Sequence, residues 1–497
     1  MTLVSKAKEL ACLALFTLAA FAVHGYHLGT EDGAIYVPAI KKIADPSLYP
    51  VNAQFFSHHA SLSLFPNLVG GMASLFSVPI DWAIFLTYLF SLFLLLLAVR
   101  QLACLCFSNE RARWGAVALL AGVLSVPVCG TALILVDPYL TARSLSTPTT
   151  ILAIAYLLGG QRLRALGWFA ATALIHPQMS VYGIAFAITL ECIRYARRRV
   201  SQSAAVPALA AALILPFYFE LQPAHGAYRE ILESRSYFLI SRWEWYELVG
   251  AILPLLILWK LSEMKRLRVN ANFSALCSAL VIFGIAFSAV ALVLASSPRF
   301  QYLARLQPMR SFHLIYLVFF VILGGILGEY VLRGHLWRWA VLFVPLAAGM
   351  WTVDAKTFPA SPHIEWPGVP YRNGWLAAFK WVSGNTPKDA YFVLDPDYLN
   401  LPGVDVHGFR ALAERSALAD RLKDSGAASV FPELSEGWKD QVSAQSGWKS
   451  IRDADFRNLR DRFGVQWLVV ESTRSLSFEC PYRNAVAMVC RIERPSL

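Results

Sequence analysis

The chain has 497 residues, of which 57% are hydrophobic and only 15% charged, and its formal net charge at pH 7 is +11. A soluble core of this size does not require so many apolar side chains, so the composition excludes a soluble or disordered protein. The basic residues lie mainly in short loops between apolar runs, as membrane insertion demands. We therefore expect a polytopic membrane protein with no nucleic-acid partner.

Apolar runs that could cross a bilayer follow one another along residues 1–353. A span needs about 20 apolar residues. The first run lacks a small-residue cleavage signal, which favours a retained helix over a signal peptide. The run 61–79 contains a proline and a pair of glycines and is predicted to be a re-entrant or interfacial helix. Eleven spans are predicted, at 9–26, 82–104, 113–134, 145–160, 165–176, 178–195, 203–219, 248–261, 274–296, 312–331 and 336–353.

Loop charges orient these spans. With eleven spans and a cytoplasmic N-terminus, seventeen basic residues fall in inner loops and nine in the outer loops of the membrane part. Counting 61–79 as a span reverses this bias, which the positive-inside rule disfavours. The predicted fold is therefore a helical membrane domain (1–353) with a first outer loop at 27–81, followed by an extracytoplasmic α/β domain (354–497). We expect a bacterial inner membrane, with the C-terminal domain in the periplasm.

The C-terminal region has an ordinary soluble composition and clear element patterns. Helices are predicted at 373–390 and 455–464, strands at 390–396 and 465–472, and one or two more strands at the end. Cys480 and Cys490 lie ten residues apart across a predicted hairpin. They could form a disulfide if this region lies outside the cytoplasm.

Two adjacent carboxylates, Glu31 and Asp32, directly follow the first span in the stretch GTEDGAIYVPAIKKIADPSLYP. A carboxylate there could act as a general base on an acceptor, or help hold a divalent cation such as Mg²⁺ or Mn²⁺. The alternative is a polar collar that ends a span. Lys41 and Lys42 follow on a short amphipathic helix, where they could face a phosphate or snorkel to the membrane interface.

Further candidate residues lie in the other predicted outer loops. Asp137 and Arg143 share one short loop, which suits a second carboxylate with a phosphate-binding arginine, or a local ion pair. His176 divides two apolar runs and could bind substrate hydroxyls or a phosphate, or simply end a helix. A loop without acids carries three arginines that could bind an anion or pair with C-terminal acids: Arg299, Arg305 and Arg310.

Four histidines in and after the first span could form a metal site together with Asp32. They are His24, His27, His58 and His59. Their spacing is not that of a metal site, so we predict no metal ligands among them.

The layout resembles the GT-C superfamily of membrane glycosyltransferases, which use polyprenyl-phosphate-linked sugars. The matching features are GTEDGAIYVPAIKKIADPSLYP in the first outer loop, VDPYLTAR in the second, and an α/β domain after the last span. The resemblance implies that Asp32 or Glu31 is the catalytic base or a metal-binding carboxylate, and that Asp137 is an accessory acid. It also implies that outer-loop residues such as Arg305 or Arg310 bind the lipid phosphate.

The leading functional hypothesis is an inverting glycosyltransferase with a polyprenyl-phosphate sugar as donor and a glycan, lipid or protein as acceptor. The alternatives are a transporter or flippase of lipid-linked glycans, and a non-catalytic assembly protein. Transport predicts broken helices or ionisable residues at the bilayer midplane and an internal two-fold repeat. The sequence shows neither, which favours catalysis.

Overall fold

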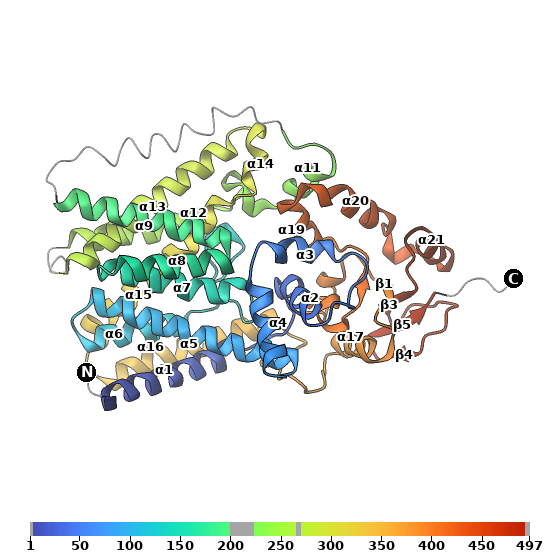
Figure 1. Cartoon of the computed structure of the whole chain (residues 1–497), viewed down its shortest axis with the longest axis horizontal. Helices are drawn as coiled ribbons and strands as arrows, with labels where there is room; N and C mark the ends of the chain where they lie inside the picture. Colours follow the sequence, from blue (N-terminus) through green and yellow to red (C-terminus); the bar gives the residue numbers. More distant parts are fainter. Residues whose placement is uncertain (1–2, 199–222, 265–269, 493–497) are drawn as a thin grey trace.

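The computed structural model describes residues 3–198, 223–264 and 270–492. Figure 1 shows a bundle of long helices at one end of the molecule and the C-terminal domain at the other, with the short helices α2, α3 and α4 between them. The N-terminus lies at the far end of the bundle, and the C-terminus lies at the opposite end of the molecule. The first outer loop is therefore held between the two main parts.

The bundle contains long apolar helices. Seven segments of the described ranges are long and apolar enough to cross a membrane. The long helices are α1 (Leu3–His24), α5 (Ile80–Cys106), α9 (Pro177–Arg198), α12 (Trp245–Glu263), α13 (Ala271–Ala295), α15 (Phe312–Ile326), continued by the π-helix η7 (Leu327–Leu332), and α16 (Leu336–Thr357).

Three predicted spans form shorter helices, and one cannot be assessed. The shorter ones are α6 (Glu110–Gly122), α7 (Ala142–Leu158) and α8 (Arg162–Ile175). The predicted span 203–219 lies outside the described residues. The structure thus supports a multi-pass helical protein, while the count of eleven spans stays a prediction.

Large apolar side chains cover the outside of the bundle. Leu336, Val341 and Val344 on α16 are all strongly exposed, and none of the apolar segment of this helix is buried. Exposing such an apolar surface to water costs free energy, whereas contact with lipid tails does not. The exposed apolar surface therefore identifies the bundle as membrane-embedded.

The predicted span 113–134 is wrong in its second half. Helix α6 ends at Gly122, and residues 123–136 fold back on themselves. Val128 donates its amide hydrogen to the Leu133 carbonyl, and Pro127 pairs with Ile134 in an antiparallel bridge. Pro127 has no amide hydrogen to continue a helix, so the apolar sequence forms a turn instead.

The first outer loop contains three short helices: α2 (Gly33–Ala44), α3 (Gln54–Ser61) and α4 (Phe65–Leu75). Helix α4 has 11 residues. At about 1.5 Å per residue it is far shorter than the roughly 30 Å of a bilayer core. As predicted, the run 61–79 does not form a spanning helix.

The C-terminal domain is built on a five-stranded sheet of order β2-β1-β3-β5-β4. Strand β1 pairs in parallel with β2 and β3, and β5 pairs antiparallel with β3 and β4. The strands are β1 (Tyr391–Val393), β2 (Ser416–Ala417), β3 (Trp467–Glu471), β4 (Tyr482–Arg483) and β5 (Ala487–Arg491). The helices are α17 (Gly374–Asn385), α18 (Phe409–Ala413), α19 (Lys423–Val430), α20 (Ser435–Ala444) and α21 (Asp453–Phe463).

The two faces of this sheet belong to different cores. Val469 and Val489 lie in the large cluster that continues into the helical bundle. Leu468 and Met488, on the opposite face, pack with Phe456 of α21 in a separate small cluster. Alternate strand residues point to opposite faces, which explains the division. The C-terminal domain is thus packed continuously against the bundle.

The disulfide that the sequence left open is present. Cys480 and Cys490 are bonded, with their Cα atoms 3.9 Å apart. The bond closes the segment that leads through β4 into β5.

Candidate functional site

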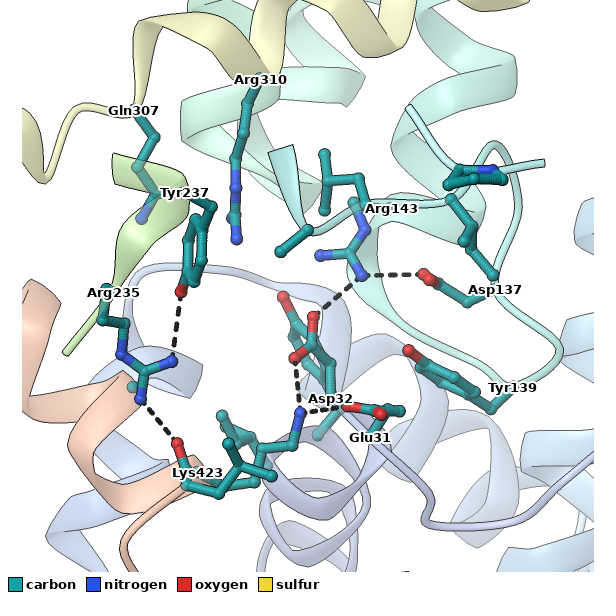
Figure 2. A pocket seen from close by; sticks show the side chains of 18 of the residues that line it. Glu31, Asp32, Asp137, Tyr139, Arg143, Arg235, Tyr237, Gln307, Arg310 and Lys423 are labelled. Atoms are coloured by element: carbon teal, nitrogen blue, oxygen red, sulfur yellow. Dashed lines mark hydrogen bonds and ion pairs between the residues drawn. The ribbon is translucent and has the colours of Figure 1, made fainter. Parts of the chain in front are cut away.

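A pocket of about 610 Å³ lies where the bundle, the first outer loop and the C-terminal domain meet (Figure 2). Its walls contain six of the ten predicted site residues: Glu31, Asp32, Asp137, Arg143, His176 and Arg310. The pocket therefore unites chemistry-bearing residues from four separate predicted loops.

The backbone at the start of α2 presents Asp32 to the pocket. Glu31 has a left-handed φ of 48°, which is uncommon for a residue with a side chain and is a form of strain found at functional sites. Asp32 is the N-cap of α2, but its carboxylate makes no capping hydrogen bond. An N-cap aspartate usually stabilises its helix through such a bond, and Asp32 does not. Its side chain is instead directed at other groups in the pocket.

Arg143 joins the two aspartates. Its Nη2 atom lies 2.9 Å from an oxygen of Asp32 and 2.9 Å from an oxygen of Asp137. The side chains of Arg143 and Asp137 are 7% and 6% exposed, whereas that of Asp32 is 31% exposed. A molecule in the pocket can therefore reach Asp32. Asp137 is more deeply buried and forms an ion pair with Arg143.

The C-terminal domain contributes Lys423, the first residue of α19. Its Nζ atom lies 2.6 Å from Glu31 Oε2 and 3.5 Å from Asp32 Oδ1. Asp32 thus sits between Arg143 and Lys423, as Figure 2 shows. This placement distinguishes Asp32 from Glu31, whose ion pair is with Lys423.

The surrounding cations keep Asp32 ionised. Burial acts to raise the pKa of Asp32, but the charges of Arg143, Lys423 and Arg310 outweigh it and hold that pKa well below its usual range. For Asp137, burial is the largest effect and raises the pKa despite Arg143. Asp32 is therefore a carboxylate at neutral pH.

Two arginines at the pocket have no carboxylate partner among the described residues: Arg235 and Arg310. The Nε atom of Arg310 is buried without a hydrogen-bond partner in the described part of the chain. Arg235 donates to the Leu422 carbonyl at 2.6 Å and to the Tyr237 hydroxyl at 3.2 Å. The Tyr237 ring lies 6.0 and 5.8 Å from the guanidinium carbons of Arg235 and Arg310. The three side chains form one wall that carries uncompensated positive charge (Figure 2).

A fixed loop holds Arg310 in this position. The hydroxyl oxygen of Tyr182, on α9, lies 2.6 and 2.9 Å from the carbonyl oxygens of Leu306 and Gln307, to either of which it can donate. Gln307 itself has a left-handed φ of 52°. The strained turn is thus anchored to the bundle just before Arg310.

Two imidazoles also line the pocket, those of the buried His176 and the partly buried His59. Burial lowers the pKa of both, and nearby Arg143 acts in the same direction. His59 Nε2 lies 3.0 Å from the Tyr36 hydroxyl. Neutral imidazoles can accept or donate hydrogen bonds to hydroxyl groups, as a sugar would require.

Four predicted phosphate-binding residues do not line the pocket: Lys41, Lys42, Arg299 and Arg305. Lys42 donates to the Leu48 carbonyl at 2.8 Å. Arg299 and Arg305 are exposed, and Arg305 donates to the Val430 carbonyl at 3.4 Å. Lys42 and Arg305 thus contact backbone carbonyls of loops, and Arg299 lies at the surface. These residues were expected to share the site with Asp32, and the structure places them outside its pocket.

Lys41 is a structural residue of the junction between the domains. It is buried, and its Nζ atom lies 2.8 Å from Glu414 and 3.1 Å from Asp81. We expect Lys41→Met to lower the free energy of unfolding by about 3 kcal/mol, because it leaves two acids unpaired in a buried contact. Thermal unfolding in detergent measures this effect. Lys42→Met, which removes only contacts to backbone carbonyls, is the matched control and should change stability much less.

Sequence reasoning missed three of the groups that shape the pocket: Arg235, Tyr237 and Lys423. Lys423 is 392 residues from its partner Glu31 and belongs to no recognisable motif. Arg235 and Tyr237 lie in the loop between the predicted spans 203–219 and 248–261, which contains no recognisable site motif. No local signal indicates that these segments meet.

The pocket does not fit a divalent cation held by its two aspartates. One guanidinium nitrogen of Arg143 already lies 2.9 Å from both carboxylates, in the position that a bridging cation would take. A different group of described residues could hold a metal ion, namely His27, Glu365 and His407. The predicted absence of metal ligands among the histidines therefore stays a prediction, and His27 is the one of the four that such a group would include.

Comparison with solved structures finds eight similar chains, among them two of an archaeal oligosaccharyltransferase. No family model and no curated protein matches the chain. One neighbour is the archaeal oligosaccharyltransferase AglB from Archaeoglobus fulgidus, in complex with an inhibitory peptide and a dolichol-phosphate. It shows 13% identity and a TM-score of 0.46, over 95% of this chain and 70% of the other.

Another neighbour is the Archaeoglobus fulgidus oligosaccharyltransferase in complex with Zn and sulfate. It shows 15% identity and a TM-score of 0.44, over 93% of this chain and 68% of the other. At these values the likeness does not identify an activity or a ligand. The function is therefore inferred from the pocket itself.

Proposed function

We propose that the protein is a membrane glycosyltransferase that transfers a sugar from a polyprenyl-phosphate donor to an acceptor hydroxyl or amine. The observation that carries this proposal is the opposition, within one pocket, of an accessible carboxylate and an uncompensated cationic wall. Asp32 is on one side, and Arg235 and Arg310 are on the other. Guanidinium groups match the oxygens of a phosphate, and a carboxylate can take a proton from a nucleophile.

The proposed reaction uses the two sides of the pocket in turn. Arg310 and Arg235 bind the phosphate of the donor, which places the anomeric carbon between them and Asp32. An oxygen of Asp32 accepts the proton of the acceptor, whose oxygen or nitrogen forms a bond to the anomeric carbon. The bond between that carbon and the phosphate oxygen breaks, and the polyprenyl phosphate leaves with the electron pair. Attack from the opposite face inverts the anomeric configuration.

Donor binding also prepares the base. The pKa of Asp32 is held low partly by Lys423 and Arg310. A donor phosphate beside Arg310 adds negative charge, which offsets this field and raises the pKa of Asp32. Asp32 thus becomes a stronger base when the donor is present. His59 and His176 would hold sugar hydroxyls as neutral hydrogen-bonding groups.

We also propose that this pocket, with residues 354–497, lies outside the cytoplasm of a bacterium, with the inner membrane around the bundle. The bond between Cys480 and Cys490 supports an oxidising compartment. The bias of basic residues in the loops supports the same orientation. A cysteine accessibility assay on intact cells tests this orientation.

A transfer assay tests the proposed activity. The purified protein is reconstituted in liposomes that contain polyprenyl-phosphate sugars, and the formation of free polyprenyl phosphate is measured with and without candidate acceptors. Acceptor-dependent cleavage supports the proposal. Movement of the intact lipid across the bilayer, without cleavage, would instead identify a flippase.

Arg310→Gln is expected to raise the KM for the donor about 10- to 100-fold, with a smaller effect on kcat. A hydrogen bond to a charged group contributes about 1.5–3 kcal/mol, and each 1.4 kcal/mol corresponds to about tenfold in affinity. Steady-state kinetics over a range of donor concentrations measures the change. Arg305→Gln removes an exposed arginine five residues away and should leave the KM unchanged. Equal effects of the two substitutions would place the phosphate elsewhere.

A further inference from the structure

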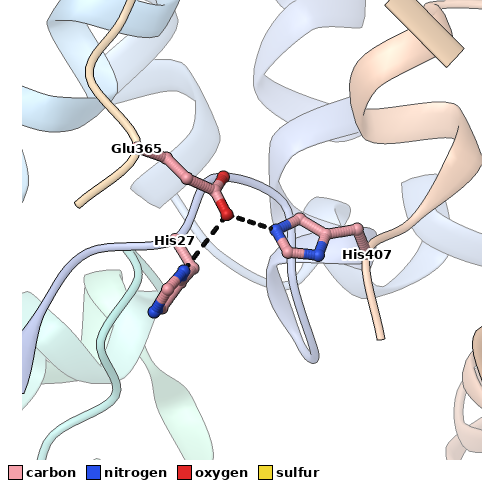
Figure 3. Close-up of side chains that lie close together, drawn as sticks. All are labelled: His27, Glu365 and His407. Carbon is pink, nitrogen blue, oxygen red and sulfur yellow. Dashed lines mark hydrogen bonds and ion pairs between the residues drawn. The ribbon is translucent and has the colours of Figure 1, made fainter. Parts of the chain in front are cut away.

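A second group of chemistry-bearing side chains lies at the junction of the bundle and the C-terminal domain. His27 follows α1, Glu365 lies in the linker after α16, and His407 lies just before α18. All three are buried, and one ligand atom of each lies within 4.8 Å of the others. Figure 3 shows the two imidazole rings directed at the same carboxylate oxygen.

The orientation of the rings shows which nitrogen atoms are free for a ligand. His27 Nδ1 and His407 Nε2 lie 3.1 and 2.8 Å from Glu365 Oε1. The opposite nitrogen of His27 faces Asp354 Oδ1 at 3.2 Å, and that of His407 faces the Val404 carbonyl at 3.0 Å. A neutral imidazole that donates to such an outer acceptor keeps a lone pair on its inner nitrogen. Two lone pairs and a carboxylate then converge on one point, an arrangement that a bound cation would stabilise.

This pattern is that of metal-binding histidines. Their outer nitrogen atoms usually donate to a carboxylate or a backbone carbonyl, which fixes the ring. Two imidazoles and one carboxylate are ligands that zinc and similar ions prefer, whereas Mg²⁺ and Ca²⁺ prefer oxygen atoms alone. Zinc–ligand bonds of about 2.0–2.1 Å place the ligand atoms of a tetrahedral site about 3.3 Å apart. The observed 3.1 and 2.8 Å need a small outward shift, and the two imidazole nitrogen atoms, which lie within 4.8 Å of each other, would move toward the same spacing.

We propose that His27, Glu365 and His407 bind one divalent transition-metal ion of the zinc class, with Asp354 as a positioning residue. Because the ligands are buried, the ion has a structural role. It fastens the segment after α1 to the linker and to the loop before α18. The binding site does not depend on the proposed transfer activity.

The fastened segment is the one that carries the acids of the pocket. Beyond His27, Gly408 donates its amide hydrogen to the Gly29 carbonyl at 2.9 Å, and Thr30 donates to the Asp405 carbonyl at 2.9 Å. The Glu31 amide donates to the Val406 carbonyl at 3.1 Å. The ion would thus close one end of a row of contacts that leads directly to Glu31 and Asp32. Metal binding should therefore make this loop more rigid.

Metal analysis of the full-length protein tests the site. The protein is purified with a tag that contains no histidine, stripped with a chelator and reloaded with Zn²⁺. We expect one zinc ion per chain by mass spectrometry, a higher midpoint of thermal unfolding, and an X-ray absorption spectrum with only nitrogen and oxygen ligands. Glu365→Gln should lose the bound zinc. His363→Gln is the matched control, because His363 contacts Asp354 at 2.6 Å but is not a ligand, and it should retain the zinc.

Three results would overturn the site. The first is a wild-type zinc content no higher than that of Glu365→Gln, and the second is a sulfur ligand in the spectrum. If Glu365→Gln does not fold, Asp354→Asn provides the test: it should weaken zinc binding about 10- to 100-fold, as losses of such outer partners do. Unchanged affinity in that variant is the third.

Discussion

Asp32→Asn is expected to lower the rate of sugar transfer by about 10²- to 10⁴-fold, the usual contribution of a positioned general base. The amide has the shape of the carboxylate but cannot take the proton of the acceptor. Donor and acceptor should still bind, so the loss falls mainly on kcat. Release of polyprenyl phosphate from a labelled donor measures it.

Glu31→Gln is the matched control for this prediction. Glu31 is adjacent to Asp32 in the sequence, and both acids contact Lys423. Asp32 differs in that it also forms an ion pair with Arg143, which in turn contacts Asp137. We expect the Glu31 variant to lose less than about tenfold. A larger loss in Glu31→Gln than in Asp32→Asn would assign the base to Glu31 instead.

Arg143→Gln is expected to be the most destabilising single change in the pocket. It leaves the buried Asp137 without its ion partner, which costs about 3–5 kcal/mol in free energy of unfolding. The midpoint of thermal unfolding in detergent should fall accordingly. Adding Asp137→Asn removes the unpaired charge, so the double variant should be more stable than Arg143→Gln alone.

The double variant also separates structure from activity. Asp32 would remain in place in it but lose the arginine that orients its carboxylate. We expect the double variant to be folded and still defective in transfer. An Arg143→Gln protein as stable as the wild type would show that Asp137 is neutral or solvated, and would contradict the account of the ion pairs.

The arrangement of helices follows largely from the sequence. Apolar runs predict where the long helices lie, because a lipid-facing helix must be apolar over its length. The prediction fails at 123–134, where the residues are apolar but fold back through a turn between Val128 and Leu133. Hydropathy reports burial and not backbone geometry, so it cannot separate a helix from a buried turn.

The candidate site was only partly predictable. Glu31, Asp32, Asp137 and Arg310 stand out because charges next to apolar spans are rare and costly. By the same criterion Lys41 stood out, and the structure instead pairs it with Glu414 and Asp81. Whether such a charge faces a pocket or an acid depends on the other domain, which local sequence does not describe.

The contacts between distant segments are the part that the sequence could not supply. His27 and Glu365 are 338 residues apart, and neither lies in a motif with metal-ligand spacing. Lys423 reaches the pocket from a helix, α19, that was not predicted. Such pairings arise from packing of the C-terminal domain on the first outer loop, and they become visible only in three dimensions.

A structure of the protein with a non-cleavable polyprenyl-phosphonate sugar would test the central claim most directly. The proposed mechanism predicts phosphonate oxygens within about 3 Å of the guanidinium groups of Arg310 and Arg235, at hydrogen-bond distance. It also predicts that the anomeric carbon faces Asp32. A phosphonate bound at Arg299 and Arg305, with the pocket around Asp32 filled by another part of the chain, would contradict the proposed function.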